Sequence, residues 1–188
     1  MSVNASDLPF PLAGSTLVVG PSNVGKTRLT ARALEAWVAE RGADGVAVLE
    51  FAPEVERDGE LLGGRLSRFT AVPDGAWHGV LDAHAPRADS GTAAGALELA
   101  AENADGAARL LDAAPPDPAA VFVNDATIPF QADRRDAAAL TGYCDRAEAG
   151  VLNAFESDEL GVDDAVSRNE RAALDRLRAW ADRVVELG

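Results

Sequence analysis

The chain has 188 residues, of which 47% are hydrophobic, and it carries 31 acidic against 17 basic residues for a net charge of −14. No stretch approaches the ~20 unbroken apolar residues of a membrane-spanning helix, so no membrane partner is expected, and the single cysteine, Cys144, excludes an internal disulfide. A composition this acidic does not readily supply the basic face that nucleic acid requires, so nucleic acid is not expected as a direct partner.

The distribution of charge also bears on the cellular environment. Of the 17 basic residues, Lys26 is the only lysine and the other 16 are arginines. An acidic, lysine-poor surface suits the salt-rich cytoplasm of a halophile, because the Debye length falls to about 3 Å at 1 M salt and charge repulsion is screened. Residues 1–12 lack the basic and apolar regions of a secretory signal, which predicts a cytoplasmic location.

The first part of the chain is expected to alternate strands and helices. After an N-terminal extension, 1–13, the apolar run Ser15–Val19 is typical of a buried parallel strand. A helix is predicted from Arg28 to Glu40, where apolar residues recur on one side and Gly42 follows as a C-cap. The next expected elements are a strand at 46–51, a short helix at 60–69 and a strand at 69–72.

The second part of the chain continues the alternation. Residues 79–95 form a polar connection without a clear period, which fits a mobile loop near a site or a surface crossing equally well. The expected elements are helices at 93–113, 133–155 (interrupted near Gly142 or Gly150) and 163–181, with strands at 119–123 and 184–187. This order predicts an α/β fold: a single domain, 1–188, built as a three-layer sandwich around a mainly parallel sheet.

The segment between the first strand and the first helix matches the pattern G-x-x-x-x-G-K-[ST] at every fixed position. In such a loop the glycines allow close backbone approach, and the amides at the helix N-terminus form a positive cradle for phosphates. The predicted nucleotide-binding residues are Gly20, Pro21, Ser22, Asn23, Val24, Gly25, Lys26, Thr27 and Arg28.

The loop predicts ATP and Mg²⁺ as ligands. Lys26 is expected to reach the β- and γ-phosphates, and the Thr27 hydroxyl to coordinate the magnesium ion. Every other basic residue of the chain is an arginine, yet the only lysine lies at the loop position where phosphate binding requires a compact ammonium. This placement supports the prediction independently of the pattern.

A second anchor for magnesium is expected at the end of the strand 119–123, where Asn124 and Asp125 follow the apolar run. The usual pattern has an aspartate directly after such a strand, and Asn124 takes that place here. Two arrangements stay open: Asp125 holds the magnesium with its water shell, or Asn124 does and Asp125 assists the attacking group. The competing interpretation is that Asp125 only caps the turn before Ile128.

On the strength of Gly20–Thr27, the chain is identified as a member of the P-loop NTPases, and it resembles their RecA-like division. In that division a glutamate near the end of a neighbouring strand polarises the attacking water. Glu50 resembles this residue, since it lies within the apolar strand 46–51 where an unpaired charge would be costly, and Glu54 is the alternative. The resemblance therefore implies Lys26, Glu50 and Asp125 as catalytic residues.

A narrower resemblance is to the adenosylcobinamide kinase/guanylyltransferase family. The segments that carry it are Val48–Ala52 with the later Asp58, Glu60, Arg65 and Trp77, then Glu159–Gly161 and Ala181–Val184. That family has a guanylyl-accepting histidine after its second strand, whereas this chain reads Arg-Leu-Ser-Arg-Phe at 65–69. The resemblance thus implies the fold and not guanylyl transfer.

The remaining candidate residues are expected to be structural. His78 and His84 have no metal-ligand spacing, Cys144 fits a small buried residue better than a nucleophile, and the pair 134–135 fits a surface arginine pair better than a phosphate contact.

The motifs leave two functions open. One is a magnesium-dependent ATPase or small-molecule kinase; the other is a nucleotide-dependent switch with little turnover that recruits a protein partner. A guanine-specific enzyme is disfavoured, because its Asn-Lys-x-Asp motif needs a second lysine. A homo-oligomer is compatible with the resemblance, since RecA-like domains often complete their sites from a neighbouring subunit.

Overall fold

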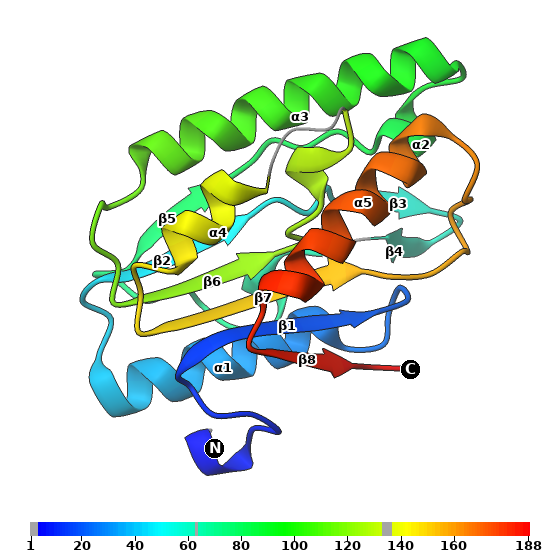
Figure 1. The fold of residues 1–188 in the computed structure, drawn as a ribbon. Coiled ribbons are helices and arrows are strands. Elements are labelled where there is room, and N and C mark those ends of the chain that lie inside the picture. Colours follow the sequence, from blue (N-terminus) through cyan, green and yellow to red (C-terminus); the bar gives the residue numbers. More distant parts are fainter. Residues whose placement is uncertain (1–3, 63, 133–136) are drawn as a thin grey trace.

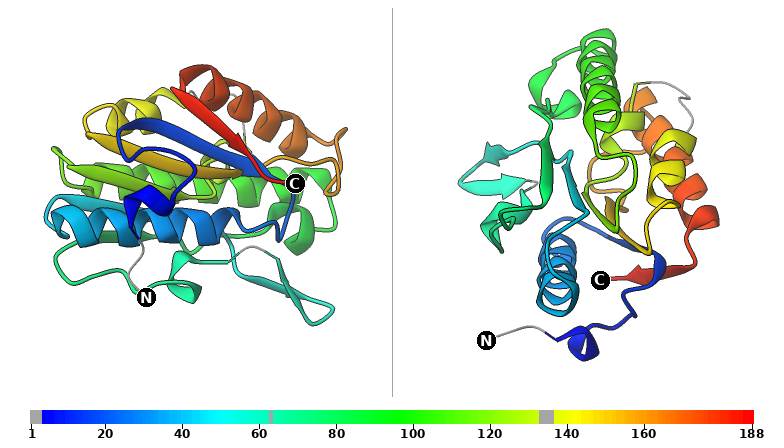
Figure 2. Two further views of the ribbon diagram at one scale, coloured as in Figure 1. Left: turned by 90° about the horizontal axis from the view of Figure 1, so that it is seen from below. Right: turned by 90° about the vertical axis from the view of Figure 1, so that its left-hand side faces the viewer.

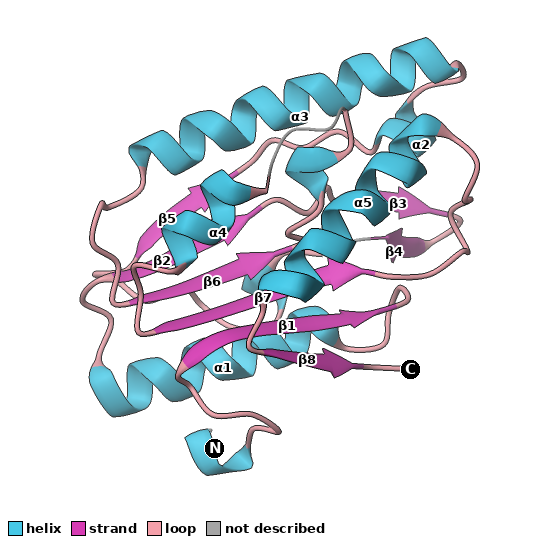
Figure 3. Cartoon of the chain, viewed as in Figure 1, coloured by secondary structure: helices cyan, strands magenta, loops and turns pink. Residues whose placement is uncertain are grey.

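The computed structural model describes residues 4–62, 64–132 and 137–188. The helices are α1 (Lys26–Arg41), α2 (Pro86–Asp89), α3 (Ala93–Ala113), α4 (Ala138–Cys144) and α5 (Ala165–Trp180), with 3-10 turns η1 (Ala5–Asp7), η2 (Leu66–Arg68) and η3 (Ile128–Phe130). The strands are β1 (Gly14–Gly20), β2 (Val46–Glu50), β3 (Val55–Arg57), β4 (Glu60–Leu62), β5 (Trp77–Val80), β6 (Ala120–Asn124), β7 (Ala149–Phe155) and β8 (Arg183–Glu186). Figure 3 shows these elements by type.

The described strands form one six-stranded sheet in the order β5-β2-β6-β7-β1-β8, and every neighbouring pair in it is parallel. Strand β7 lies between β1 and β6, so the loop after β1 and the turn after β6 are one strand apart (Figure 1). A separate two-stranded hairpin, β3-β4, lies outside this sheet. The predicted α/β class with a parallel sheet is confirmed.

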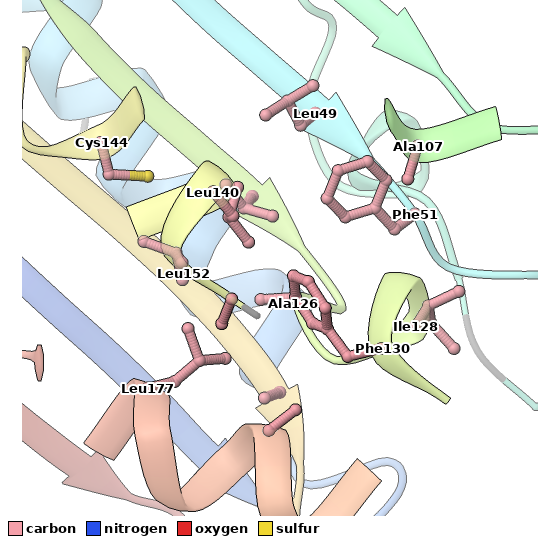
Figure 4. Packing of buried hydrophobic residues seen from close by; sticks show 14 of the residues in the cluster. Leu49, Phe51, Ala107, Ala126, Ile128, Phe130, Leu140, Cys144, Leu152 and Leu177 are labelled. Carbon is pink, nitrogen blue, oxygen red and sulfur yellow. The ribbon is translucent and has the colours of Figure 1, made fainter. Parts of the chain in front are cut away.

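The sheet is covered on both faces, as expected for a three-layer sandwich (Figures 1 and 2). Along β1, Leu17 and Val19 join the core on the α3, α4 and α5 side, whereas Val18 joins the core on the α1 side. This alternation follows from the two-residue period of a strand. Figure 4 shows the first of these cores, in which Leu140 and Leu177 pack over the sheet near Leu152.

The N-terminal extension is part of the packed structure. Leu8, Phe10 and Leu12 are buried in the same core as Trp37 of α1. The side chain of Arg32 on α1 also donates a hydrogen bond to the carbonyl of Asp7. These contacts attach the described part of the extension to the outer helix.

Several predicted elements are confirmed within one or two residues, including β1, α1, β2, α3, β6, α5 and β8. The predicted helix at 133–155 is wrong in its second half. Residues 133–136 lie outside the described ranges, Ala138–Cys144 is helical, and Ala149–Phe155 is the strand β7. The alanines and the leucine of Ala149–Phe155 suit a helix locally, but β6 and β1 pair with this segment on both sides, and this tertiary pairing outweighs the local preference.

The region after β2 also differs from the prediction. In place of a helix at 60–69, the chain turns through Asp58 and Gly59, both with positive φ (53° and 79°), and forms the β3-β4 hairpin followed by η2. Asp-Gly is a favoured pair for such a turn. No strand forms at 69–72; the edge strand β5 begins instead at Trp77.

Because all six strands run in one direction, their carboxyl ends meet at one edge of the sheet. The loop after β1, the end of β2, the turn after β6 and the segment after β7 therefore gather there. In open parallel sheets this edge is the usual place for a ligand.

Candidate nucleotide-binding site

The backbone between β1 and α1 leaves the helix N-terminus uncapped. Gly25, the residue before α1, has φ 100°, and no side chain of the described structure caps the first turn. Asn23 has φ 61°, a left-handed conformation that asparagine tolerates. At Gly20 a Cβ would lie 2.2 Å from the carbonyl oxygen of Leu187, so only glycine fits against β8 and its following residues. The amides of the first helical turn thus stay open to an anion.

Lys26 lies folded over this loop. Its ammonium donates a hydrogen bond to the carbonyl of Pro21 and lies 6.0 Å from the centroid of the Phe155 ring. Burial lowers the pKa of Lys26, and the nearby carboxylates of Asp125 and Glu159 oppose that shift. The only lysine of the chain is thus in a partly desolvated position among loop carbonyls and carboxylates.

An anionic side chain already occupies one amide of the loop. The Ser22 amide donates a hydrogen bond of 2.8 Å to Oε1 of Glu159, which lies in the connection between β7 and α5. A carboxylate oxygen thus occupies the amide of Ser22 in this structure. In the sequence, Glu159 stands out only through a family resemblance, and no local pattern indicates its contact with Ser22.

Thr27 and Asn124 connect the loop to the neighbouring strands. The Thr27 hydroxyl donates a 3.2 Å hydrogen bond to Oδ1 of Asn124, which also accepts one of 3.0 Å from Nδ2 of Asn153 on β7. The Asn124 amide group in turn donates to Oε2 of Glu50 at 2.9 Å and to the carbonyl of Gly64 at 2.7 Å. Asn124 is therefore the residue at the end of β6 that lies beside the Thr27 hydroxyl.

The two carboxylate oxygens of Glu50 are hydrogen-bonded to groups outside the loop. Its side chain is fully buried, Oε2 accepts from Asn124, and Oε1 accepts from the amide of Leu66 at 2.8 Å. The ring of His78 lies nearby, with Nε2 at 3.9 Å from Oε1. Glu54, the alternative glutamate, is at the surface, where the hydrogen bond from Arg68 lowers its pKa. Glu50 thus links η2 to Asn124 in this structure.

Asp125 follows β6 with φ 62°, and its amide donates a 2.9 Å hydrogen bond to Oδ1 of Asn153. Its carboxylate atom Oδ1 is buried and has no hydrogen-bond partner within the described protein. Burial raises the pKa of Asp125 to about 7, with Glu170 adding to the shift and Lys26 and Arg87 opposing it. Oδ1 of Asp125 thus does not cap the turn, because a capping oxygen would accept a hydrogen bond from a backbone amide.

The tertiary structure adds residues that the sequence did not single out. Asn153 is buried in the middle of the site edge, between Thr30 (2.9 Å) and Asn124, and was placed in a helix by the prediction. Glu170 of α5 is also buried and forms an ion pair of 2.8 Å with Arg87 of α2. Asn153 is a single polar residue in an apolar run, as Glu50 is in its own strand. This pattern could have indicated Asn153 as a candidate site residue.

Two cavities flank the loop. One, of 400 Å³, runs along Gly25, Thr27 and Arg28 and has Arg68 and Phe69 among its lining residues. The other, of 270 Å³, lies between Ser22, Asp125 and α2. Among the described residues, the first cavity is therefore lined by basic residues and by no carboxylate, whereas the second is lined by Asp125, Glu159 and Glu170 with the single arginine Arg87.

The other candidate residues stay outside this site. His84 pairs with Glu102 at 2.8 Å, and Cys144 is buried, which raises the pKa of its thiol. The arginine pair 134–135 lies outside the described residues. Among the described residues no group of three or more His, Cys, Asp or Glu side chains is arranged to hold a metal ion.

The sequence matches no family model and no curated protein among those with which it was compared. Of the helices in the described ranges, none combines the length and the apolar character that crossing a membrane requires. The described structure is an α/β protein with the loop Gly20–Thr27 at the carboxyl edge of a parallel sheet.

Proposed function

We propose that the chain binds ATP with magnesium through Gly20–Thr27 and transfers the γ-phosphoryl group, as an ATPase or a small-molecule kinase. The observation that carries this proposal is the 2.8 Å hydrogen bond from the Ser22 amide to the Glu159 carboxylate. The donor is an amide of the loop that precedes α1, and its partner is an anionic oxygen. Phosphate oxygens suit the same position.

The residues around the loop have the chemistry that this function needs. Lys26 supplies a compact positive charge, and Arg28 and Arg68 line the adjoining 400 Å³ cavity, where they would neutralise a triphosphate chain. Magnesium would take the Thr27 hydroxyl and, through its water shell, Asn124, since it prefers hard oxygen ligands and retains several waters. When bound, the ion would neutralise charge on the β- and γ-phosphates.

The contacts favour one of the two arrangements that the sequence left open. Asn124 lies beside Thr27, with 3.2 Å between Oδ1 and Oγ1, whereas Asp125 lines the 270 Å³ cavity on the Ser22 side. We therefore assign Asn124 to the magnesium shell and Asp125 to the attacking group. Glu50 acts in this proposal as a positioning residue, because both of its oxygens hold other groups: the Leu66 amide and the Asn124 side chain.

A nucleotide-dependent switch is the second candidate, and one chain of hydrogen bonds favours it. The chain runs from Thr27 through Asn124 and Glu50 to the Leu66 amide of η2. Capture of the Thr27 hydroxyl by magnesium would remove the first of these bonds and leave Asn124 free to shift. The state of the nucleotide would then be transmitted to η2, next to the exposed side chain of Phe69.

The test measures ATP binding and magnesium-dependent ADP formation separately, in concentrated potassium chloride. The wild-type chain is compared with Lys26→Ala and with the matched control Arg41→Ala, which removes a positive charge at the other end of α1. We expect Lys26→Ala to weaken ATP binding at least tenfold and Arg41→Ala to leave it within twofold. Absence of ATP binding in the wild type would exclude both candidates; binding without turnover would exclude the enzyme and support the switch.

A further inference from the structure

The 270 Å³ cavity beside the loop has the features of a substrate pocket. It begins at Ser22 and Asp125 and extends between α2 and η3. Much of its wall is apolar, formed by Pro53, Ala85, Pro86, Ala88, Ile128, Phe155 and Leu160. An apolar wall with a few polar groups is typical of small-molecule sites, and this volume lies just below their usual range of about 300–1,000 Å³. A ligand of this cavity would therefore be a small molecule.

Two buried hydrogen-bond acceptors in this wall lack a partner within the described protein: Oδ1 of Asp125 and Oε1 of Gln131. The orientation of the Gln131 amide is determined by its neighbour. Its nitrogen donates a 3.0 Å hydrogen bond to Oε1 of Glu170, whose other oxygen, Oε2, is paired with Arg87. A carboxylate accepts hydrogen bonds, so the nitrogen of the Gln131 amide faces Glu170 and its oxygen faces away. The Gln131 side chain is only 1% exposed, so its oxygen needs a donor from the cavity.

The charges around the cavity select among donors. Three carboxylates line it, those of Asp125, Glu159 and Glu170, against the single guanidinium of Arg87, which is already paired with Glu170. If ATP displaces Glu159 from Ser22, two carboxylates still face one guanidinium on this wall, and although Lys26 and Arg87 attract the Asp125 carboxylate, neither donates a hydrogen bond to its Oδ1. A ligand with a carboxylate or phosphate would meet repulsion here, whereas a neutral or cationic molecule would not.

We propose that this cavity binds the phosphoryl acceptor, and that the acceptor is a small neutral or cationic alcohol; the inference rests on the proposed function. The hydroxyl group donates to Asp125, and a second donor of the molecule pairs with Gln131. In the reaction the hydroxyl oxygen attacks the γ-phosphorus and its proton passes to the Asp125 carboxylate. The bond from the γ-phosphorus to the bridging oxygen breaks, and ADP leaves with that electron pair, so the products are ADP and a phosphate monoester.

The size of the cavity argues against water as its only occupant. A water molecule takes about 30 Å³ of liquid volume, so several would be needed to fill the 270 Å³, and those against the apolar wall would lack the two to four polar partners that an ordered water needs. An alcohol with an apolar or polyol body fills the same space and pairs both free acceptors. A pocket built to hydrogen-bond a hydroxyl group also discriminates strongly against analogues that lack it.

The test uses the full chain with a non-hydrolysable ATP analogue and a panel of paired probes. Each pair joins an alcohol to the carboxylate of similar skeleton, such as glycerol with glycerate and ethanolamine with glycolate. Binding is measured by ligand-detected saturation-transfer NMR, and transfer by the appearance of labelled organic phosphate from ATP labelled at the γ-position. We expect at least one alcohol to bind and to accept the label, and its carboxylate partner to bind at least tenfold more weakly.

Two variants make the assignment specific to the cavity. Ala88→Trp fills the cavity from an exposed position on α2, and Ala108→Trp places the same ring on the exposed face of α3 as a control. Ala88→Trp should weaken alcohol binding at least tenfold, with its melting temperature and ATP affinity reporting that it is folded, while Ala108→Trp leaves alcohol binding unchanged.

The outcomes separate this inference from the proposed function. ATP hydrolysis without binding of any alcohol would overturn the inference and leave the ATPase intact. Equal binding of alcohols and carboxylates, or an unchanged response in Ala88→Trp, would also overturn it. Failure of the wild type to bind ATP would overturn the proposed function first and the inference with it.

Discussion

Glu159 and Ser22 are far apart in the sequence, yet the carboxylate of one accepts a 2.8 Å hydrogen bond from the amide of the other. Glu159 belongs to the connection after β7, which also carries the exposed side chains of Leu160 and Val162. An anionic ligand that bound to this amide would have to displace Glu159. Breaking the contact between Ser22 and Glu159 would reduce the free energy of binding of such a ligand. The sequence of the loop alone does not reveal this competition.

Replacing Glu159 with Gln should tighten ATP binding roughly three- to tenfold, because a competing anion and its repulsion of the phosphates are removed. The measurement is the dissociation constant of ATP at constant salt concentration. Asp158→Asn is the matched control, since it removes the neighbouring carboxylate, which is 79% exposed and pairs with Arg171. Equal tightening in both variants would show that net charge, and not the contact with Ser22, is responsible.

The buried pair of Glu50 and Asn124 should behave as a coupled unit. Glu50→Gln leaves one of two buried donors, the Leu66 amide or the Asn124 amide group, without an acceptor, which should lower the free energy of unfolding by about 2 kcal/mol. Asn124→Asp places a second carboxylate beside Glu50 and should cost about 3 kcal/mol or more.

Combining Glu50→Gln with Asn124→Asp exchanges the amide and the carboxylate, so a hydrogen bond between positions 50 and 124 can form again. The double variant should therefore be more stable than the sum of the single effects by about 1 kcal/mol or more. Denaturant unfolding of the four proteins measures this coupling. Additive effects would mean that the two side chains do not interact in the folded protein.

Asp125 should make stability depend on pH. Burial raises its pKa from 3.8 to about 7 in the folded protein, so between these values the folded chain holds a proton that the unfolded chain has lost. The free energy of unfolding therefore falls as the pH rises through this window, and the loss is complete above about pH 7. Asp125→Asn removes the penalty and should be more stable than the wild type by roughly 2 kcal/mol or more at about pH 8.

Unfolding of both proteins by denaturant at about pH 4 and about pH 8 checks this prediction. The gain from Asp125→Asn should shrink toward zero at the lower pH, where the wild-type carboxyl is protonated in the folded protein and partly protonated in the unfolded chain. Asp158→Asn, at an exposed position, serves as the control and should show no such trend. A gain of equal size at both pH values would contradict the assigned cause.

The acidic composition should make the fold salt-dependent. With a net charge of −14, self-repulsion is strongest at low ionic strength. The melting temperature should rise when potassium chloride is increased from about 0.1 M to about 2 M, since the Debye length shortens from roughly 10 Å to a few Å. Sucrose, which does not screen charge, is the control. A melting temperature that is unchanged by the salt would contradict the expectation of a halophilic protein.

Local sequence patterns predicted much of the framework. β1, α1 and α3 carry their own signals: an apolar run before the loop, a helical apolar stripe, and a long alanine-rich stretch ended by prolines. β7 does not, because Ala149–Phe155 has few β-branched residues and becomes a strand through pairing with both β1 and β6. The β3-β4 hairpin had a local signal, the Asp58–Gly59 pair, that the helix prediction overlooked.

By itself, the sequence determined the loop Gly20–Thr27 and the parallel α/β class, because contiguous residues encode both. Only the tertiary structure decided which side chains meet there. It joined Glu159 to Ser22, and it brought Asn124 beside Thr27 and Glu50 beside Asn124. The physical reason is that parallel strands bring their carboxyl ends together at one edge, so the partners of each polar group come from segments that are distant in the chain.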